Sequence, residues 1–101
     1  MSKVSVFAKF ACVEGKGEEM DAALAAVVAA SEGVNGVESY SYHRDDNGTY
    51  WFFALMSSME AAQSHGDNEA MQAAMPALMA LMAGPPEMSM TTPMAANGLD
   101  I

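Results

Sequence analysis

Residues 50–65 read YWFFALMSSMEAAQSH and join an aromatic strand to a short helix. The first half is rich in aromatic residues, which favour strands. Ser57 is a residue type that caps helices, and Glu60, three positions later, completes a capping box. The helix predicted from this pattern ends at His65, so the stretch places an ionisable ring just after a strand and a turn.

Both faces of the strand at residues 50–56 are apolar. Alternation puts Trp51, Phe53 and Leu55 on one face. The opposite face carries Tyr50, Phe52, Ala54 and Met56. Helices of the same chain can cover one of these faces, and a second copy packing sheet to sheet is the simplest cover for the other. The pattern therefore predicts a homodimer formed through the sheet face.

Apolar periodicity predicts the remaining elements. Strands are expected at residues 3–13, 37–45, 49–56 and 87–94, with Asp46-Asn47-Gly48 as the hairpin turn. One helix is expected from Lys16 to about Gly33, and a second helical stripe comprises Met71, Met75, Leu78, Met79 and Met82. The order βαββαβ predicts an α+β, ferredoxin-like domain over residues 1–94, with two helices on one face of a four-stranded antiparallel sheet. Residues 95–101 are expected to form a loose tail.

The 101 residues suit a single domain, and their formal net charge of −9 disfavours nucleic acid and anionic membranes as partners. No apolar run approaches the roughly 20 residues of a membrane-spanning helix. The N-terminus lacks the pattern of a signal peptide, which predicts a cytoplasmic protein. The single cysteine, Cys12, falls in a predicted strand and is interpreted as a core residue.

No motif for a metal or a nucleotide cofactor is present. His43 and His65 are the only histidines, and Gly15-Lys16-Gly17 lacks the third glycine of a dinucleotide fingerprint. The eleven methionines, including Met88 and Met90, allow a copper(I)-handling protein as a distant alternative, because thioethers are soft ligands. Core packing explains them better, so neither a metal nor a cofactor is predicted.

With this element order, residues 3–94 resemble the antibiotic biosynthesis monooxygenase family of dimeric α+β barrels. The resemblance rests on Gly15-Lys16-Gly17-Glu18-Glu19, on Gly36-Val37 before a tyrosine-bearing strand, and on Glu60-Ala61-Ala62 followed by His65. Relatives commonly carry a glutamate and a tryptophan where this chain has Ala54 and Met56. Haem-degrading relatives also use an asparagine in the first strand, which is absent here, so haem degradation is disfavoured.

The resemblance implies oxidation of electron-rich phenols or hydroquinones without a cofactor, which requires a base, an anion stabiliser and an apolar pocket. Histidine suits the base, and arginine or tyrosine suits the stabiliser. The catalytic candidates are His65, His43 and Arg44, and the candidate substrate contacts are Tyr40, Tyr42, Trp51, Phe53 and Met75. His65 fits best by motif, although a histidine in the last turn of a helix also bonds free carbonyls. His43 and Arg44 are neighbours on a strand, so at most one faces a given pocket.

Two functions follow from these residues. The first is a cofactor-independent monooxygenase acting on a small aromatic phenol or quinol. The alternative is a non-catalytic dimer of the same fold that binds a small ligand, which is favoured by Ala54 and Met56 at the expected polar and indole positions.

Overall fold

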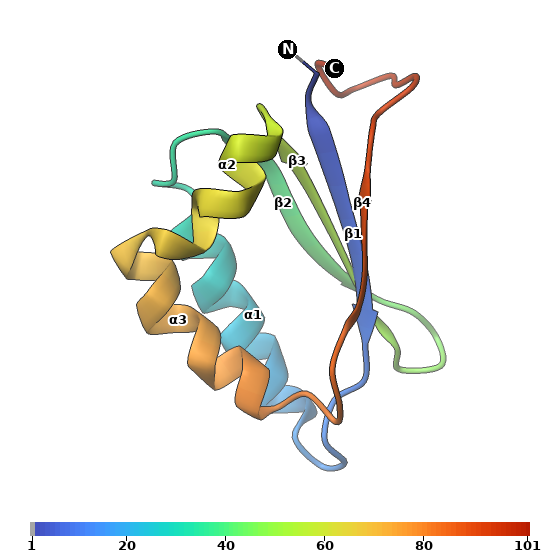
Figure 1. The fold of residues 1–101 in the computed structure, drawn as a ribbon. Helices are drawn as coiled ribbons and strands as arrows, with labels where there is room; N and C mark the ends of the chain where they lie inside the picture. Colours follow the sequence, from blue (N-terminus) through green and yellow to red (C-terminus); the bar gives the residue numbers. More distant parts are fainter. Residues whose placement is uncertain (1) are drawn as a thin grey trace.

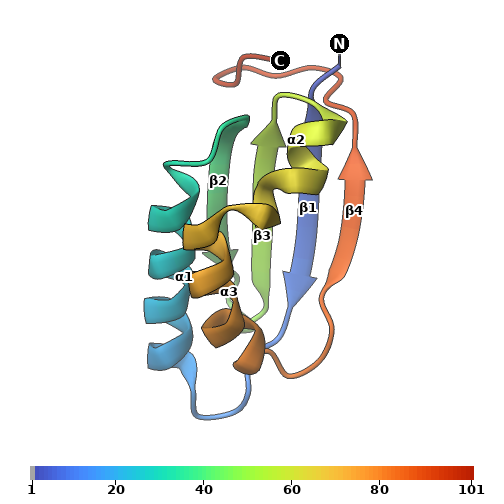
Figure 2. The same ribbon diagram turned by 60° about the vertical axis from the view of Figure 1, so that its left-hand side comes forward.

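A computed structural model describes residues 2–101 as an antiparallel sheet covered on one face by helices (Figure 1). The elements are β1 (Val4–Phe10), α1 (Gly17–Ser31), β2 (Val37–Arg44), β3 (Tyr50–Met56), α2 (Met59–Ser64), the 3₁₀ turn η1 (His65–Asp67), α3 (Glu69–Ala80) and β4 (Glu87–Thr91). The four strands lie in the order β2-β3-β1-β4, which can be followed in Figure 2. The predicted ferredoxin-like α+β fold is thus confirmed, with the second helical region divided into α2, η1 and α3.

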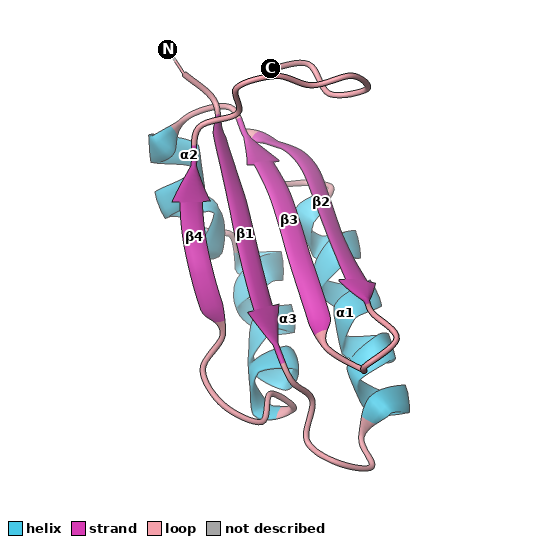
Figure 3. Cartoon of the chain, turned by 90° about the vertical axis from the view of Figure 1, so that its right-hand side faces the viewer, coloured by secondary structure: helices cyan, strands magenta, loops and turns pink. Residues whose placement is uncertain are grey.

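The strand register separates the two faces of the sheet as the alternation predicts. β1 lies between β3 and β4, and its Ala8 is paired with Phe52 and Met88. The neighbouring Lys9 is paired with Trp51 and Glu87 on the opposite side. The side with Ala8 packs on the helices, and we call the other side the outer face. Figure 3 views the sheet from the outer face, with the helices behind it.

One irregularity in β2 was not predicted. Val37 pairs with Met56 and Ser39 pairs with Leu55, so Glu38 is an extra residue in β2 and forms a bulge. The bulge resets the alternation, and the tyrosines further along β2 face the helices. Glu38 itself accepts a hydrogen bond from Lys3 at 2.7 Å.

The cap of α2 differs from the predicted one by one residue. Ser58, not Ser57, is the N-cap, and its hydroxyl accepts a hydrogen bond from the backbone N–H of Ala61 at 3.1 Å. Glu60 therefore stands one position too early for the capping box. Ser57 instead donates its backbone N–H to the carbonyl of Gly36 at 2.8 Å, which fixes the turn between β3 and α2 to the start of β2.

The apolar side of α3 packs against α1 and the sheet. Met71 and Leu78 have no exposed surface, as the predicted stripe requires. Met79 was placed in that stripe, and this placement is wrong, because its side chain is 60% exposed. The inward stripe comprises positions 71, 75, 78 and 82, and residue 79 lies just outside it.

The outer face remains partly apolar and partly covered. Phe7 and Trp51 are 48% and 44% exposed, whereas Leu55 is only 1% exposed. Residues 92–101 run back over this end of the sheet, and Leu99 and Ile101 lie in the same hollow as Leu55. None of the helices within residues 2–101 is long and apolar enough to cross a membrane.

Candidate functional site

A cavity of about 170 Å³ lies between the helix-facing side of the sheet and the side chains of η1 and α3. We call it the inner cavity. It is lined by Val6, Ala8, Phe10, Tyr40, Tyr42, Phe52, Met56, His65, Met75, Met82, Pro86 and Met88. The cavity is thus lined by four of the predicted residues, Tyr40, Tyr42, His65 and Met75.

Aromatic rings form the sheet wall of the inner cavity. The ring of Phe52 lies 4.7 Å from that of Tyr40 and 4.8 Å from that of Tyr42. Phe10 meets Tyr42 edge to face at 6.1 Å. These tilted and edge-to-face arrangements fix the ring planes. A flat apolar ligand therefore meets a preformed aromatic surface.

The two tyrosine hydroxyls remain protonated at neutral pH. Burial raises the pKa of Tyr40, and a contact with Tyr42 offsets part of that rise. Burial also raises the pKa of Tyr42, and the neighbouring Tyr40 raises it further. A phenol is a hydrogen-bond donor only in its protonated form, and one of the two hydroxyls is used in the hydrogen bond between them, so the pair can offer one free donor to an oxyanion in the cavity.

His65 is the first residue of the 3₁₀ turn η1, directly after α2. Its Nδ1 lies 2.8 Å from the carbonyl oxygen of Ala62. A carbonyl only accepts, so Nδ1 carries the proton and Nε2 of the neutral ring is left with a free lone pair. The ring centroid lies 6.3 Å from that of Tyr40. The imidazole is therefore held in the tautomer that a general base requires, beside the aromatic wall.

Thioethers complete the inner cavity. Met75 of α3 and Met82 just beyond it face the sheet, and Met56 at the end of β3 is fully buried. Met88 of β4 is 60% exposed and lies at the cavity mouth. No lysine, arginine, aspartate or glutamate is among the lining residues. The cavity is therefore apolar except for the imidazole and two phenol hydroxyls.

The other predicted site residues lie outside the inner cavity. His43, Trp51 and Phe53 are on the outer face, where His43 pairs with Trp51 across the strands. The Nε2 of His43 is 2.9 Å from the hydroxyl of Ser41. As their adjacent positions predict, Arg44 points to the opposite side from His43.

Arg44 is engaged in an ion pair at the end of the sheet. Its guanidinium lies 3.1 Å from the carboxylate of Asp21 on α1. It also donates to the hydroxyl of Tyr50 at 3.4 Å. The hydrogen bond with Tyr50, followed by the pairing with Asp21, raises the pKa of Arg44. Arg44 thus joins α1 to β2 and β3, and it does not line the inner cavity.

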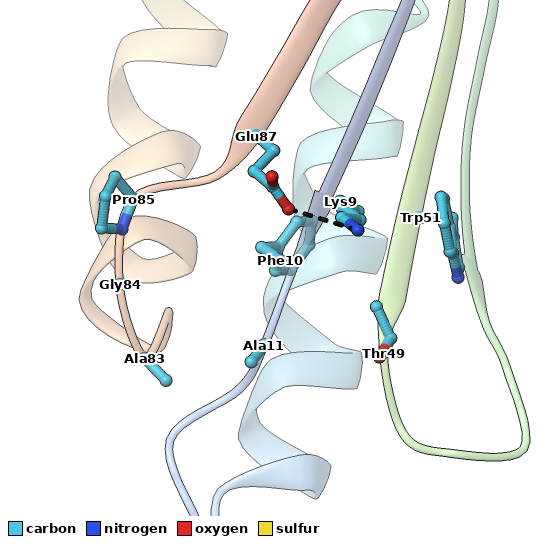
Figure 4. A pocket seen from close by; sticks show the side chains of 9 residues that line it. All are labelled: Lys9, Phe10, Ala11, Thr49, Trp51, Ala83, Gly84, Pro85 and Glu87. Carbon is cyan, nitrogen blue, oxygen red and sulfur yellow. Dashed lines mark ion pairs between the residues drawn. The ribbon is translucent and has the colours of Figure 1, made fainter.

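Two wider hollows, of about 400 and 530 Å³, share Lys9, Trp51 and Glu87. Figure 4 shows the first, with Lys9 directed at Glu87 and the indole of Trp51 to one side. The ammonium of Lys9 is 3.3 Å from the Glu87 carboxylate, and it lies 5.7 Å from the Trp51 ring. The positive charge of Lys9 is therefore already paired with the carboxylate of Glu87. These hollows offer neither an aromatic enclosure nor a free base.

Sequence reasoning missed part of the cavity lining, namely Phe10, Phe52, Met56, Met82 and Met88. The strand members of this set alternate with outer-face residues, so the period-two pattern was the available signal. No cluster of three or more histidine, cysteine, aspartate or glutamate residues suited to a metal exists in the described part of the chain.

Comparison with known proteins identifies the family to which the chain belongs. The sequence profile of the antibiotic biosynthesis monooxygenases matches residues 3–77. No curated protein matches the chain. A Caulobacter crescentus protein provisionally assigned to this family is similar in structure, with a TM-score of 0.84 and 24% identity over 93% of this chain and 92% of that one. SnoaB of Streptomyces nogalater, a cofactor-independent oxygenase solved as a mutant, has a TM-score of 0.81 and 16% identity over 98% of this chain and 100% of its own. At such identities the structures show a shared fold, and the profile match over residues 3–77 carries the family assignment: the chain belongs to the antibiotic biosynthesis monooxygenase family.

Proposed function

We propose that this protein is a cofactor-independent monooxygenase that oxidises a small aromatic phenol or quinol in the inner cavity. The observation that carries the proposal is the hydrogen bond from Nδ1 of His65 to Ala62, because it leaves Nε2 as a base beside an aromatic wall. The family membership and the fold shared with SnoaB support the same reaction class.

The first step is removal of a substrate hydroxyl proton by Nε2 of His65. The resulting anion is much easier to oxidise than the neutral phenol. The hydrogen-bonded pair of Tyr40 and Tyr42 donates its free hydroxyl to the developing oxyanion, and the raised pKa values keep both hydroxyls protonated at this step. The protonated imidazole adds a positive charge in the same apolar cavity, where its attraction to the anion is stronger than in water.

The substrate supplies every electron in the remaining steps. One electron passes from the anion to dioxygen, and the substrate radical and superoxide combine into a peroxide at a ring carbon. Cleavage of the O–O bond leaves one oxygen atom on the ring as a carbonyl and releases the other as water. A phenol thus becomes a quinone, with one dioxygen consumed and one water formed.

We also propose a homodimer formed through the outer face, in the cytoplasm. Phe7 and Phe53 form a contact with ring centroids 5.3 Å apart, and Phe7 and Trp51 remain about half exposed. Such an apolar patch in the middle of a sheet favours a second copy as its cover. Light scattering should give a dimer mass for the wild type and a monomer mass for Phe7→Arg. Met79→Arg, at an exposed methionine on α3 away from the outer face, should stay dimeric.

The activity is tested by oxygen uptake with the metal-free protein and a panel of hydroquinones. His65→Ala should lower turnover by about 10² or more, since general bases contribute on that order. His43→Ala is the matched control, because its ring lies on the outer face. Uptake should consume one dioxygen per substrate, and added catalase should return none, since no peroxide is released. Equal turnover in His65→Ala and the wild type would reject the assignment of the base.

A second candidate is ligand binding without chemistry. It is favoured by the third strand, in which Ala54 is fully buried and Met56 lines the inner cavity, so that β3 contributes neither an acid nor a base. Saturable binding of hydroquinones with no oxygen uptake above the protein-free rate would support this candidate over the enzyme.

A further inference from the structure

The inner cavity is small and apolar, and these properties define its ligand more narrowly than the family does. We propose that the ligand is an uncharged single-ring phenol or hydroquinone with at most small alkyl or alkoxy substituents. The inference rests on the proposed function for the reaction, and on the cavity alone for the class of ligand.

The volume of the inner cavity limits the number of rings in the ligand. The cavity measures about 170 Å³. An apolar protein cavity of about 150 Å³ holds one benzene ring. A single substituted ring therefore fills the inner cavity. A three-ring system would extend past Met88, whose exposed side chain marks the mouth, and its outer rings would remain in water.

The side chains that line the inner cavity determine which charge the ligand can carry. Neither lysine nor arginine faces the inner cavity, and the ion pairs of Lys9 and Arg44 lie elsewhere. A carboxylate on the ring would be buried with no lysine or arginine as its counter-ion, and His65 is already engaged by the ligand hydroxyl, so its burial is unfavourable. The net charge of −9 further repels an anion as it approaches. The hydroxyl opposite Nε2 of His65 is the one ligand group that finds a strong polar partner.

Met75 is positioned to limit the number of rings in the ligand. It stands on α3 opposite the aromatic wall, and the substitution Met75→Ala would deepen the cavity without adding a polar group. Met79 lies one turn further along the same helix and is 60% exposed, so Met79→Ala is the matched control. A pocket that differs by one or two methylene groups discriminates ligands by about 10-fold to 200-fold.

Binding is measured by calorimetry without oxygen, so that it is separated from turnover. The probes are methylhydroquinone, 1,4-naphthohydroquinone, 9,10-anthrahydroquinone and the anionic 2,5-dihydroxybenzoate. We expect the wild type to bind methylhydroquinone at least about tenfold more tightly than the three-ring probe. The anion should bind about a hundredfold more weakly than methylhydroquinone. Met75→Ala should shift the preference toward the two-ring probe by about tenfold, and Met79→Ala should not change it.

Three outcomes would overturn the proposed ligand class. They are equal affinity for one-ring and three-ring probes, equal affinity for methylhydroquinone and the anion, and no binding of any single-ring probe. The proposed function fails separately: selective binding of methylhydroquinone without oxygen uptake would reject the monooxygenase and leave the ligand class standing. Oxygen uptake together with equal affinity for all ring sizes would reject the ligand class and leave the monooxygenase standing.

Discussion

Gly36 holds the helix that carries His65 against the sheet, and replacing it with alanine tests that role. Its backbone φ is 88°, in the region where residues with a side chain are strained. A Cβ at this position would lie 2.6 Å from the Cβ of Ala61 in α2 and 3.0 Å from the hydroxyl of Ser57. Gly36→Ala therefore introduces both backbone strain and an overlap with α2.

The two effects can be separated with a second glycine. Gly48 has a φ of 83°, and a Cβ there would meet no atom within 4 Å. Gly48→Ala should thus lower the free energy of unfolding by about 1–2 kcal/mol from strain alone. The overlap at Gly36 adds about 1–3 kcal/mol, the usual effect of overpacking. We expect Gly36→Ala to lose about 2–5 kcal/mol, which a domain of ordinary stability can survive.

Urea unfolding followed by circular dichroism measures these losses, and a double-mutant cycle with Ala61→Gly identifies their source. Ala61→Gly removes the atom nearest to the new Cβ, so the double variant should recover the overlap part of the loss, about 1–3 kcal/mol. Two results would refute the reasoning. One is an equal loss in Gly36→Ala and Gly48→Ala, and the other is strict additivity of Gly36→Ala and Ala61→Gly.

Three further predictions concern the helix cap, the buried tyrosines and the excluded candidates. Asn68 accepts hydrogen bonds from two backbone N–H groups at the start of α3, so Asn68→Ala should lower the free energy of unfolding by about 1 kcal/mol in urea titrations. The pKa of Tyr42 is raised in the folded protein, so above a pH of about 10 the unfolded chain loses a proton that the folded chain keeps. The free energy of unfolding should therefore fall above that pH, by up to about 1.4 kcal/mol for each pH unit. Tyr42→Phe should reduce that slope, and an unchanged slope would contradict the burial argument. Arg44→Gln and His43→Ala should leave oxygen uptake within about twofold of wild type, because neither side chain lines the inner cavity.

The sequence predicts the layers of this fold well, because its signals are local. Alternation in the strands identifies which residues face the helices, and the Asn47-Gly48 turn identifies the hairpin. The bulge at Glu38 has no such signal, since it depends on how β2 meets β3 and on the hydrogen bond between Glu38 and Lys3. The shift of the cap from Ser57 to Ser58 likewise depends on a distant partner, the carbonyl of Gly36.

The site was predicted only in part, because its residues converge from separate elements. Residue type and motif identified His65, Tyr40 and Tyr42, which the structure brings together at one cavity. The same criterion of residue type also selected Trp51 and Phe53, which lie on the outer face. Aromatic side chains serve a pocket and an apolar sheet face equally well, so their type alone cannot separate the two. The register of β3 against β1 does separate them.

The position of His65 depends on short-range contacts more than on the core. The helix α2 spans only Met59–Ser64 and buries only Ala62 among its own residues. It is held by the Ser58 cap, by the hydrogen bond from Ser57 to Gly36, and by the close approach of Gly36 to Ala61. A helix of this length is not stable by itself in water, so these contacts decide where it lies. Loss of one of them should therefore displace the imidazole before it unfolds the sheet, and activity should be more sensitive than stability to changes at Gly36.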